Sequence, residues 1–308
     1  MSHGKNSLSE MRAWYLAALA APVAHLASGL GWWTVTLVAG ISMAIQQLPG
    51  GEERGEASGK RTGLIRWAIT VLAVVDAMDF FRFCWPGQKE IQWVMAILLV
   101  LAAYLSGKGR EQTKEASILL WWFIGFLLGS VLLSSVPEIR ARHLMLGRSW
   151  MQWQKAIQLL TVLLMPGLLP QQQSRKERLK LSGAVGLMAI IFGVCTQGVL
   201  SYGTAAQEKA PFYSLSRSIR LYGALDRMEG LAWLGLLLGC FVYLSLLLTA
   251  AGENGNMAWD RGRGWWIAAA AGMAMLGARA GMGVSSPVLL VLILIYGNRE
   301  KREKKVKS

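Results

Sequence analysis

The sequence predicts an all-α fold in which about ten helices cross a membrane and form one polytopic transmembrane domain. Three observations lead to this prediction. The chain has 308 residues, of which 54% are apolar, and its mean hydropathy is +0.37. Its apolar residues fall into runs of roughly 17 to 25, the length that a helix needs to cross about 30 Å of hydrocarbon. The short alternating segments that are typical of a transmembrane barrel do not occur.

Ten apolar runs are the predicted spans. Nine spans are the main alternative, because the last run is short and the turn before it is tight. The predicted spans are 12–28, 32–49, 64–84, 91–106, 116–136, 152–170, 180–202, 225–251, 265–281 and 284–298. They belong to a single domain over residues 1–308, which ends in a basic tail at 299–308.

The distribution of basic residues predicts the orientation. With the N-terminus in the cytoplasm, the cytoplasmic segments and the tail hold 21 of the 32 Lys and Arg residues. Cytoplasmic loops of membrane proteins are enriched in these residues, so we expect both termini inside an integral membrane protein of the cell membrane. The net charge of +14 then indicates contact with anionic lipid rather than with nucleic acid.

Ten spans with both ends inside are compatible with a five-plus-five inverted repeat, since each half has an odd number of helices. In such a transporter-like fold, spans 1 and 6 are the interrupted helices. Pro22 lies in span 1 and Pro166 lies in span 6. A proline removes one helical hydrogen bond, so each either opens the helix for a ligand or only bends it.

The third span carries charged residues that an ordinary membrane helix avoids. Asp76, Asp79 and Arg82 follow one another at intervals of three and share one side of a helix. A charge at the membrane centre costs about 2.5–3.5 kcal/mol on insertion scales. The residues either pair near the interface, face a water-filled cavity for a substrate, ion or proton, or pair with another span. Asp76 is the deeper acid and is our candidate for ligand contact.

A second charged set lies around the predicted exterior loop. Arg217 and Arg220 could line one face of a short helix, and Arg227 and Glu229 enter the eighth span. Arginine and carboxylate groups form strong, oriented pairs, so this set either clamps the loop on the bundle or forms a gate or docking surface. Arg279, in the ninth span, is the natural partner for an intramembrane acid.

The remaining candidates for ligand contact are on spans 1 and 6. They are Ala18 and Pro22 on the first span and Gln158 and Thr161 on the sixth, where the polar pair could instead bond to neighbouring helices. The three cysteines and three histidines are scattered and show no metal-binding pattern. No motif for phosphate binding or nucleophilic catalysis appears. We therefore expect neither an enzyme nor a cofactor.

Several stretches, taken in order, carry a resemblance to a known family. They are the opening LSEMRAWYLAALAAPVAHLASGLGWWTVTLVAG (8–40), DAMDF (76–80), AAYLSGKGREQTKEASILLWW (102–122), SVPEIR (135–140) and PFYSLSRSIRLYGALDRMEGLAWLGLLLGCFVYLSLLL (211–248). Together they resemble the permease-like B subunits of spore germination receptors, the GerAB-type family within the amino acid/polyamine/organocation transporter superfamily. The last stretch is the most specific, because Arg217, Ile219, Gly223, Arg227 and Glu229 stand at the family's spacing.

The resemblance implies a ten-helix inverted-repeat fold with a pocket near the midplane for a small nutrient, such as an amino acid. It also implies a hetero-oligomer with a membrane-embedded A-type subunit and a lipid-anchored C-type subunit, in the inner membrane of a dormant spore, that helps to trigger germination. The pocket would lie between spans 1, 3, 6 and 8.

The sequence departs from the family pattern at both interrupted helices. The first span reads AALAAP (17–22) without the family's glycine, and the sixth begins MQWQKAIQ (151–158) in place of a Phe-Pro-Phe-Gly-Glu-like stretch. A helical AALAAP offers a ligand no free backbone groups. These departures favour a receptor subunit, or a membrane scaffold that has lost ligand binding, over a secondary amino acid transporter. We expect the receptor subunit, and the scaffold and the transporter are the alternatives.

Overall fold

The chain is all-helical, as the sequence predicts. The computed structural model describes residues 3–47, 60–84, 91–144, 152–165, 175–219, 228–260 and 262–279, and none of these residues lies in a strand. The helices are α1 (His3–Ser28), α2 (Trp32–Gln47), α3 (Lys60–Cys84), α4 (Ile91–Lys108), α5 (Arg110–Ser135), α6 (Trp153–Leu164), α7 (Arg175–Leu200), α8 (Tyr202–Gln207), α9 (Pro211–Ser218), α10 (Met228–Ala258) and α11 (Arg263–Arg279), with 3-10 turns η1 (Val136–Glu138) and η2 (Ala141–Leu144).

Helices α1 to α7, α10 and α11 lie over the first nine predicted apolar runs, in the same order. The tenth run, 284–298, and the basic tail, 299–308, lie outside the described residues. The number of spans therefore stays a prediction. We call the end of the bundle with η1, η2, α8 and α9 the outer end, because the predicted orientation places it outside the cell, and the opposite end the inner end.

Within the described ranges, three helical segments are long and apolar enough to cross a membrane: Arg110–Glu138, Leu179–Leu200 and Met228–Ala258. The segments Trp32–Gln46 and Trp93–Lys108 are apolar but shorter. Apolar side chains also cover outward faces of the bundle. On α4, the exposed residues Trp93, Ile97, Leu101 and Tyr104 recur every three or four positions and so share one face. A face of this kind suits lipid rather than water, which indicates a membrane protein.

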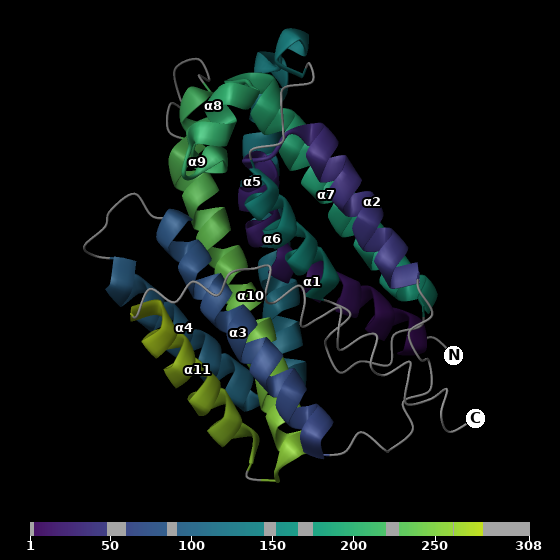
Figure 1. Cartoon of the computed structure of the whole chain (residues 1–308), viewed down its shortest axis with the longest axis vertical. Coiled ribbons are helices and arrows are strands. Elements are labelled where there is room, and N and C mark those ends of the chain that lie inside the picture. The colour runs from purple at the N-terminus through teal and green to yellow at the C-terminus, as the bar shows by residue number, and fades with distance from the viewer. Residues whose placement is uncertain are drawn as a thin grey trace.

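The long helix α10 is the centre of the packing. It contacts α1, α3, α4, α5, α9 and α11, and nearly every residue from Gly239 to Gly252 is buried. Figure 1 shows α2 and α7 side by side along one flank and α3, α4 and α11 on the other, with α10 running from α9 towards the inner end. Helix α1 packs between the two flanks, on α7, α10, α5 and α6. The two helices that form the core are thus the first and eighth predicted spans.

The tight α4–α5 turn is fixed to α10 at the inner end. Gly109 adopts a φ of 129°, which other residues rarely adopt. The Ser106 hydroxyl donates to the Ser245 carbonyl oxygen over 2.9 Å, and the Thr113 hydroxyl accepts from Thr249 at 3.5 Å. The turn therefore cannot shift without breaking contacts with the central helix.

Helix α11 depends on a close approach to α10 at Gly255. A Cβ atom at this position would overlap the indole ring of Trp266, so we expect Gly255→Ala to destabilise the chain by about 1–3 kcal/mol through overpacking. Gly272→Ala on α11 is the matched control, because a Cβ there meets nothing within 4 Å. The measurement is the thermal unfolding midpoint in detergent. Equal midpoints for the two variants would contradict the packing of α11 described here.

Candidate functional site

The pocket that the resemblance implies would lie between α1, α3, α6 and α10, and α1 is unbroken in this region. The helix runs from His3 to Ser28 with Pro22 inside it, so the proline bends α1 at most and does not open it. The second proline, Pro166, lies outside the described residues. In α1, the carbonyl and amide groups around Ala18 are therefore engaged in the helix, with one exception. The Ala18 carbonyl has no helical partner, because the residue four positions later is Pro22, which lacks an N–H.

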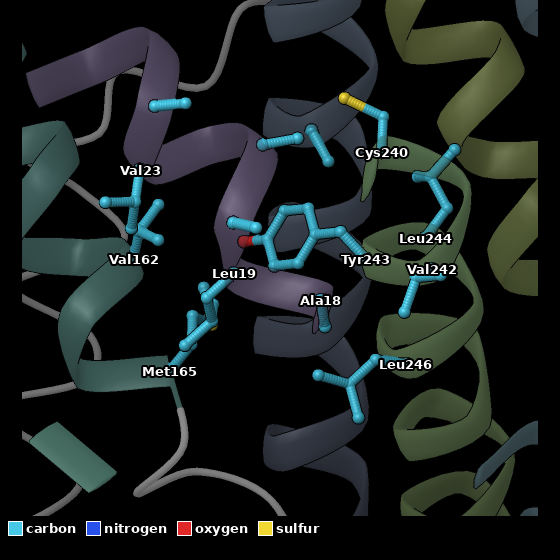
Figure 2. Packing of buried hydrophobic residues seen from close by; sticks show 14 of the residues in the cluster. Ala18, Leu19, Val23, Val162, Met165, Cys240, Val242, Tyr243, Leu244 and Leu246 are labelled. Carbon is cyan, nitrogen blue, oxygen red and sulfur yellow. The ribbon is translucent and has the colours of Figure 1, made fainter. Parts of the chain in front are cut away.

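Apolar side chains fill the space beside this part of α1. Figure 2 shows Leu19 and Val23 of α1 against Met165 and Val162, and Tyr243 of α10 reaching towards α1. All of these side chains are buried, and Ala18 is fully buried. The middle of the bundle at α1 is thus an apolar core, in which Ala18 and Pro22 are both buried.

The other candidates for ligand contact do not gather around this core. Thr161 is buried, and its hydroxyl donates to the Ile157 carbonyl oxygen one turn earlier over 2.8 Å. Gln158 is half-buried on the same helix. Asp76 is half-buried on α3 and lies within electrostatic range of Tyr243. Among the described residues, α3 packs on α10 and α11 whereas α6 packs on α1 and α2, so the structure does not bring Asp76 to the residues of α6.

Part of the predicted charge network is visible at the outer end. Arg217 of α9 and Glu229 of α10 form an ion pair, with 3.7 Å between Nε and Oε2. Both side chains are exposed, so this pair contributes little stability by itself. Arg220 and Arg227 lie outside the described residues, as do the side chains of Asp79, Arg82 and Arg279. Whether these residues extend the network stays a prediction.

A hydrogen-bond network that the sequence did not predict holds the α1–α2 turn. The buried Gln197 of α7 accepts from the Trp32 amide over 3.0 Å and donates to the His143 carbonyl oxygen over 2.9 Å. Thr196 donates to the Ser28 hydroxyl over 2.9 Å. Trp32 donates through its indole N–H to the Leu144 carbonyl oxygen. These bonds connect α1, α2, α7 and η2 at the outer end.

Two basic side chains lie beside the same turn. His25 is buried one turn before the end of α1, and Lys155, near the start of α6, lies within its electrostatic range. The ammonium group of Lys155 reaches the backbone at Gly29, where a Cβ atom would stand 2.8 Å from Nζ. Lys155 is half-buried, so the polar groups at the outer end include a cation that is partly removed from solvent.

At the inner end, an ion-pair cluster holds the other end of α1. The nearly buried Lys114 of α5 lies 3.2 Å from Glu10 of α1 and 2.7 Å from Glu111 of its own helix. Arg263 of α11 and Glu253 of α10 form a further ion pair, with 3.6 Å between Nη2 and Oε1. Helix α1 is thus tied by polar contacts at both ends and by apolar packing between them.

The residues described here show no other centre for chemistry. Within the described ranges, no group of three or more His, Cys, Asp or Glu side chains could hold a metal ion. Cys195 and Cys240 are buried and form no disulfide within the described residues. A comparison with models of known protein families finds no match for this chain, and a comparison with curated proteins finds no significant relative. The function is therefore argued from the fold and the residues.

Sequence patterns alone could not select Lys155, His25 and Gln197 as one group. They come from three helices that are distant in sequence, and each looks like an isolated polar residue in an apolar run. The one available signal was the departure of MQWQKAIQ (151–158) from the family pattern, since it places a lysine in a predicted span. A lysine in a predicted span indicates a specific role, because a charged side chain within the membrane raises the free energy of insertion.

The network at the α1–α2 turn gives a direct prediction for Gln197. Replacing it in Gln197→Leu leaves the Trp32 amide and the His143 carbonyl without their partner, and we expect a loss of about 1–3 kcal/mol of stability. Gln207→Leu, at the exposed end of α8, should be close to neutral. Thermal unfolding in detergent, followed by tryptophan fluorescence, measures both. A Gln197 variant as stable as the Gln207 variant would show that the network does not hold the turn.

Proposed function

We propose that this chain is a permease-like, membrane-embedded receptor subunit that senses a small nutrient, of the type found as the B subunit of spore germination receptors. The observation that supports this proposal most strongly is the way in which the helices pair. If the two halves of the chain are inverted repeats, spans 1 to 4 correspond to spans 6 to 9. In the helix labels, α1, α2, α3 and α4 then correspond to α6, α7, α10 and α11.

Under this correspondence, several contacts between helices have a counterpart. The α1–α7 contact has the counterpart α6–α2, and the α4–α10 contact has the counterpart α11–α3. Both members of each pair are packed contacts. Each of these helices also packs on its own counterpart in the other half. These contacts are α2–α7, α3–α10, α4–α11 and α1–α6. A transporter-like inverted repeat gives a common reason for these contacts.

Three packed contacts lack a described counterpart. Helix α1 packs on α10 and on α3, and α6 packs on α7, but the corresponding contacts of α6 with α3, of α6 with α10 and of α1 with α2 are at most slight among the described residues. The described part of the sixth predicted span ends at Met165, and the predicted span continues to residue 170.

The state of α1 favours a receptor over the alternative, a secondary amino acid transporter. Transporters of this architecture bind their substrate at interrupted helices, where unpaired backbone groups face the ligand. Here α1 is continuous, and its middle is surrounded by apolar side chains such as Leu19, Val162 and Tyr243. A receptor needs only two states with different affinity for a ligand, and it does not need a substrate path through the membrane. A scaffold without any ligand is the remaining alternative.

The test of the proposal is the set of proteins that purify with the chain. A tagged chain is extracted with a gentle detergent from native membranes, including spore inner membranes, and the bound proteins are identified by mass spectrometry. We expect an A-type and a C-type receptor subunit in constant ratio, because the proposed subunit acts in a hetero-oligomer. Recovery of the chain alone, under conditions that keep a known receptor intact, would overturn the proposal, and uptake into proteoliposomes would then test the transporter.

A further inference from the structure

The inner end of α1 is held to the bundle by side-chain contacts with the first turns of α5. Nζ of Lys114 on α5 lies 3.2 Å from Oε2 of Glu10 on α1. At the next residue of α1, the Sδ atom of Met11 accepts from Nη2 of Arg110 over 3.9 Å. The ion pair is the stronger of these two contacts, because a thioether sulfur is a weak acceptor.

The inner end of α1 also lies at the edge of the apolar core. Residues 10–13 are half-buried, whereas α1 is largely buried from Trp14 onward. A segment with few buried apolar contacts separates from its neighbours at a lower cost in free energy than a segment inside the core. The ion pair therefore has a large share in holding this end of α1 in place.

The partner of α1 in these contacts is fixed to the central helix. Thr113, beside Lys114 on α5, is buried. Its hydroxyl donates to the Gly109 carbonyl oxygen over 2.8 Å and accepts from the hydroxyl of Thr249 on α10 at 3.5 Å. If the contact between α1 and α5 opens at the inner end, α1 is therefore the helix that moves.

Lys114 has a second carboxylate beside it, which changes the cost of releasing Glu10. Oε2 of Glu111, on the same helix, lies 2.7 Å from Nζ of Lys114, closer than the carboxylate of Glu10. Breaking a buried ion pair is costly mainly because it leaves a buried charge without a partner. Lys114 is only 9% exposed, but Glu111 remains with it when Glu10 leaves. The side chain of Glu10 is already 45% exposed, so water readily takes over its carboxylate.

We propose that the Glu10–Lys114 pair is a releasable tie between α1 and α5. In the attached state, Lys114 lies between the carboxylates of Glu10 and Glu111, as in the structure. In the detached state, α1 has moved away from α5, the carboxylate of Glu10 is in water, and Lys114 keeps Glu111 as its partner. Glu111 thus lowers the cost of detachment. The tie does not depend on the identity of a ligand or of a partner protein.

The test measures how often the inner half of α1 leaves the bundle, through the reactivity of a cysteine introduced there. The full chain carries Ala17→Cys together with Cys84→Ala, Cys195→Ala and Cys240→Ala, and it is reconstituted in nanodiscs of phosphatidylcholine. Ala17 is fully buried, so a water-soluble maleimide reaches the new cysteine only when α1 has moved. The labelling rate then follows the population of the detached state. Ala18→Cys, at a second fully buried position, is the reporter if the first variant does not fold.

The two glutamates should change the labelling rate in opposite directions. Glu10→Gln removes the tie, and the rate should rise by about twofold to fivefold, the range for a partly exposed ion pair. In Glu111→Gln, detachment of Glu10 leaves the buried charge of Lys114 unpaired, so the rate should fall by about twofold or more. Glu115→Gln, at an exposed position of α5, is the matched control and should keep the original rate. The thermal unfolding midpoint of each variant verifies that it folds.

A pair that served stability alone would give a different result. Each substitution removes one carboxylate from Lys114, so both would then change the labelling rate in the same direction. Effects of the same sign, or rates that match the Glu115→Gln control, would overturn the inference. These outcomes are separate from the test of the receptor function. Opposite effects in a chain that purifies without partner subunits would refute the receptor proposal alone, and a chain that purifies with both subunits but lacks the opposite effects would refute the tie alone.

Discussion

The close packing of α10 on α1 is the contact on which the rest of the structure depends. A Cβ atom at Gly239 would stand 2.7 Å from Cβ of Ala21, and one at Gly235 would stand 2.7 Å from Cδ2 of Leu128. Small residues let helices approach closely where lipid surrounds the bundle and apolar surface alone gives no preference for protein over lipid. Helix α10 packs on both α1 and α3. The positions of the two flanks therefore depend on the packing of α10 with α1.

Within this bundle, most polar side chains satisfy their hydrogen bonds locally. The hydroxyls of Thr70, Ser117, Thr161 and Ser245 each donate to the carbonyl oxygen four residues earlier in the same helix. Such bonds let a hydroxyl exist in an apolar interior without a partner helix or ligand. A buried threonine in a predicted span is therefore weak evidence for a site. Side chains that the helix cannot satisfy by itself, such as Gln197 and Lys155, carry more information.

This difference explains how far the sequence could predict the structure. The apolar runs at 225–251 and 116–136 predicted the helices Met228–Ala258 and Arg110–Ser135, because such helices need only length and apolarity. Thr161 was a candidate for ligand contact or for a bond to a neighbouring helix, and its hydroxyl bonds within its own helix. Pro22 was a signal for either an opened or a bent helix, and only the packing around α1 decides between them. Lys155 and His25 meet through the fold, and no spacing in the sequence places them together.

The polar contacts at the two ends of α1 have a physical consequence for a receptor. At the inner end Lys114 ties α1 to α5 through Glu10, and at the outer end the network around Ser28 and Gln197 ties it to α7. Between these ends α1 is a continuous helix in an apolar core. An element held in this way moves as a unit, so a ligand that favours one position of α1 over another would act on the contacts at both ends of the helix. The size of that effect is limited by the difference in the ligand's affinity for the two positions of α1.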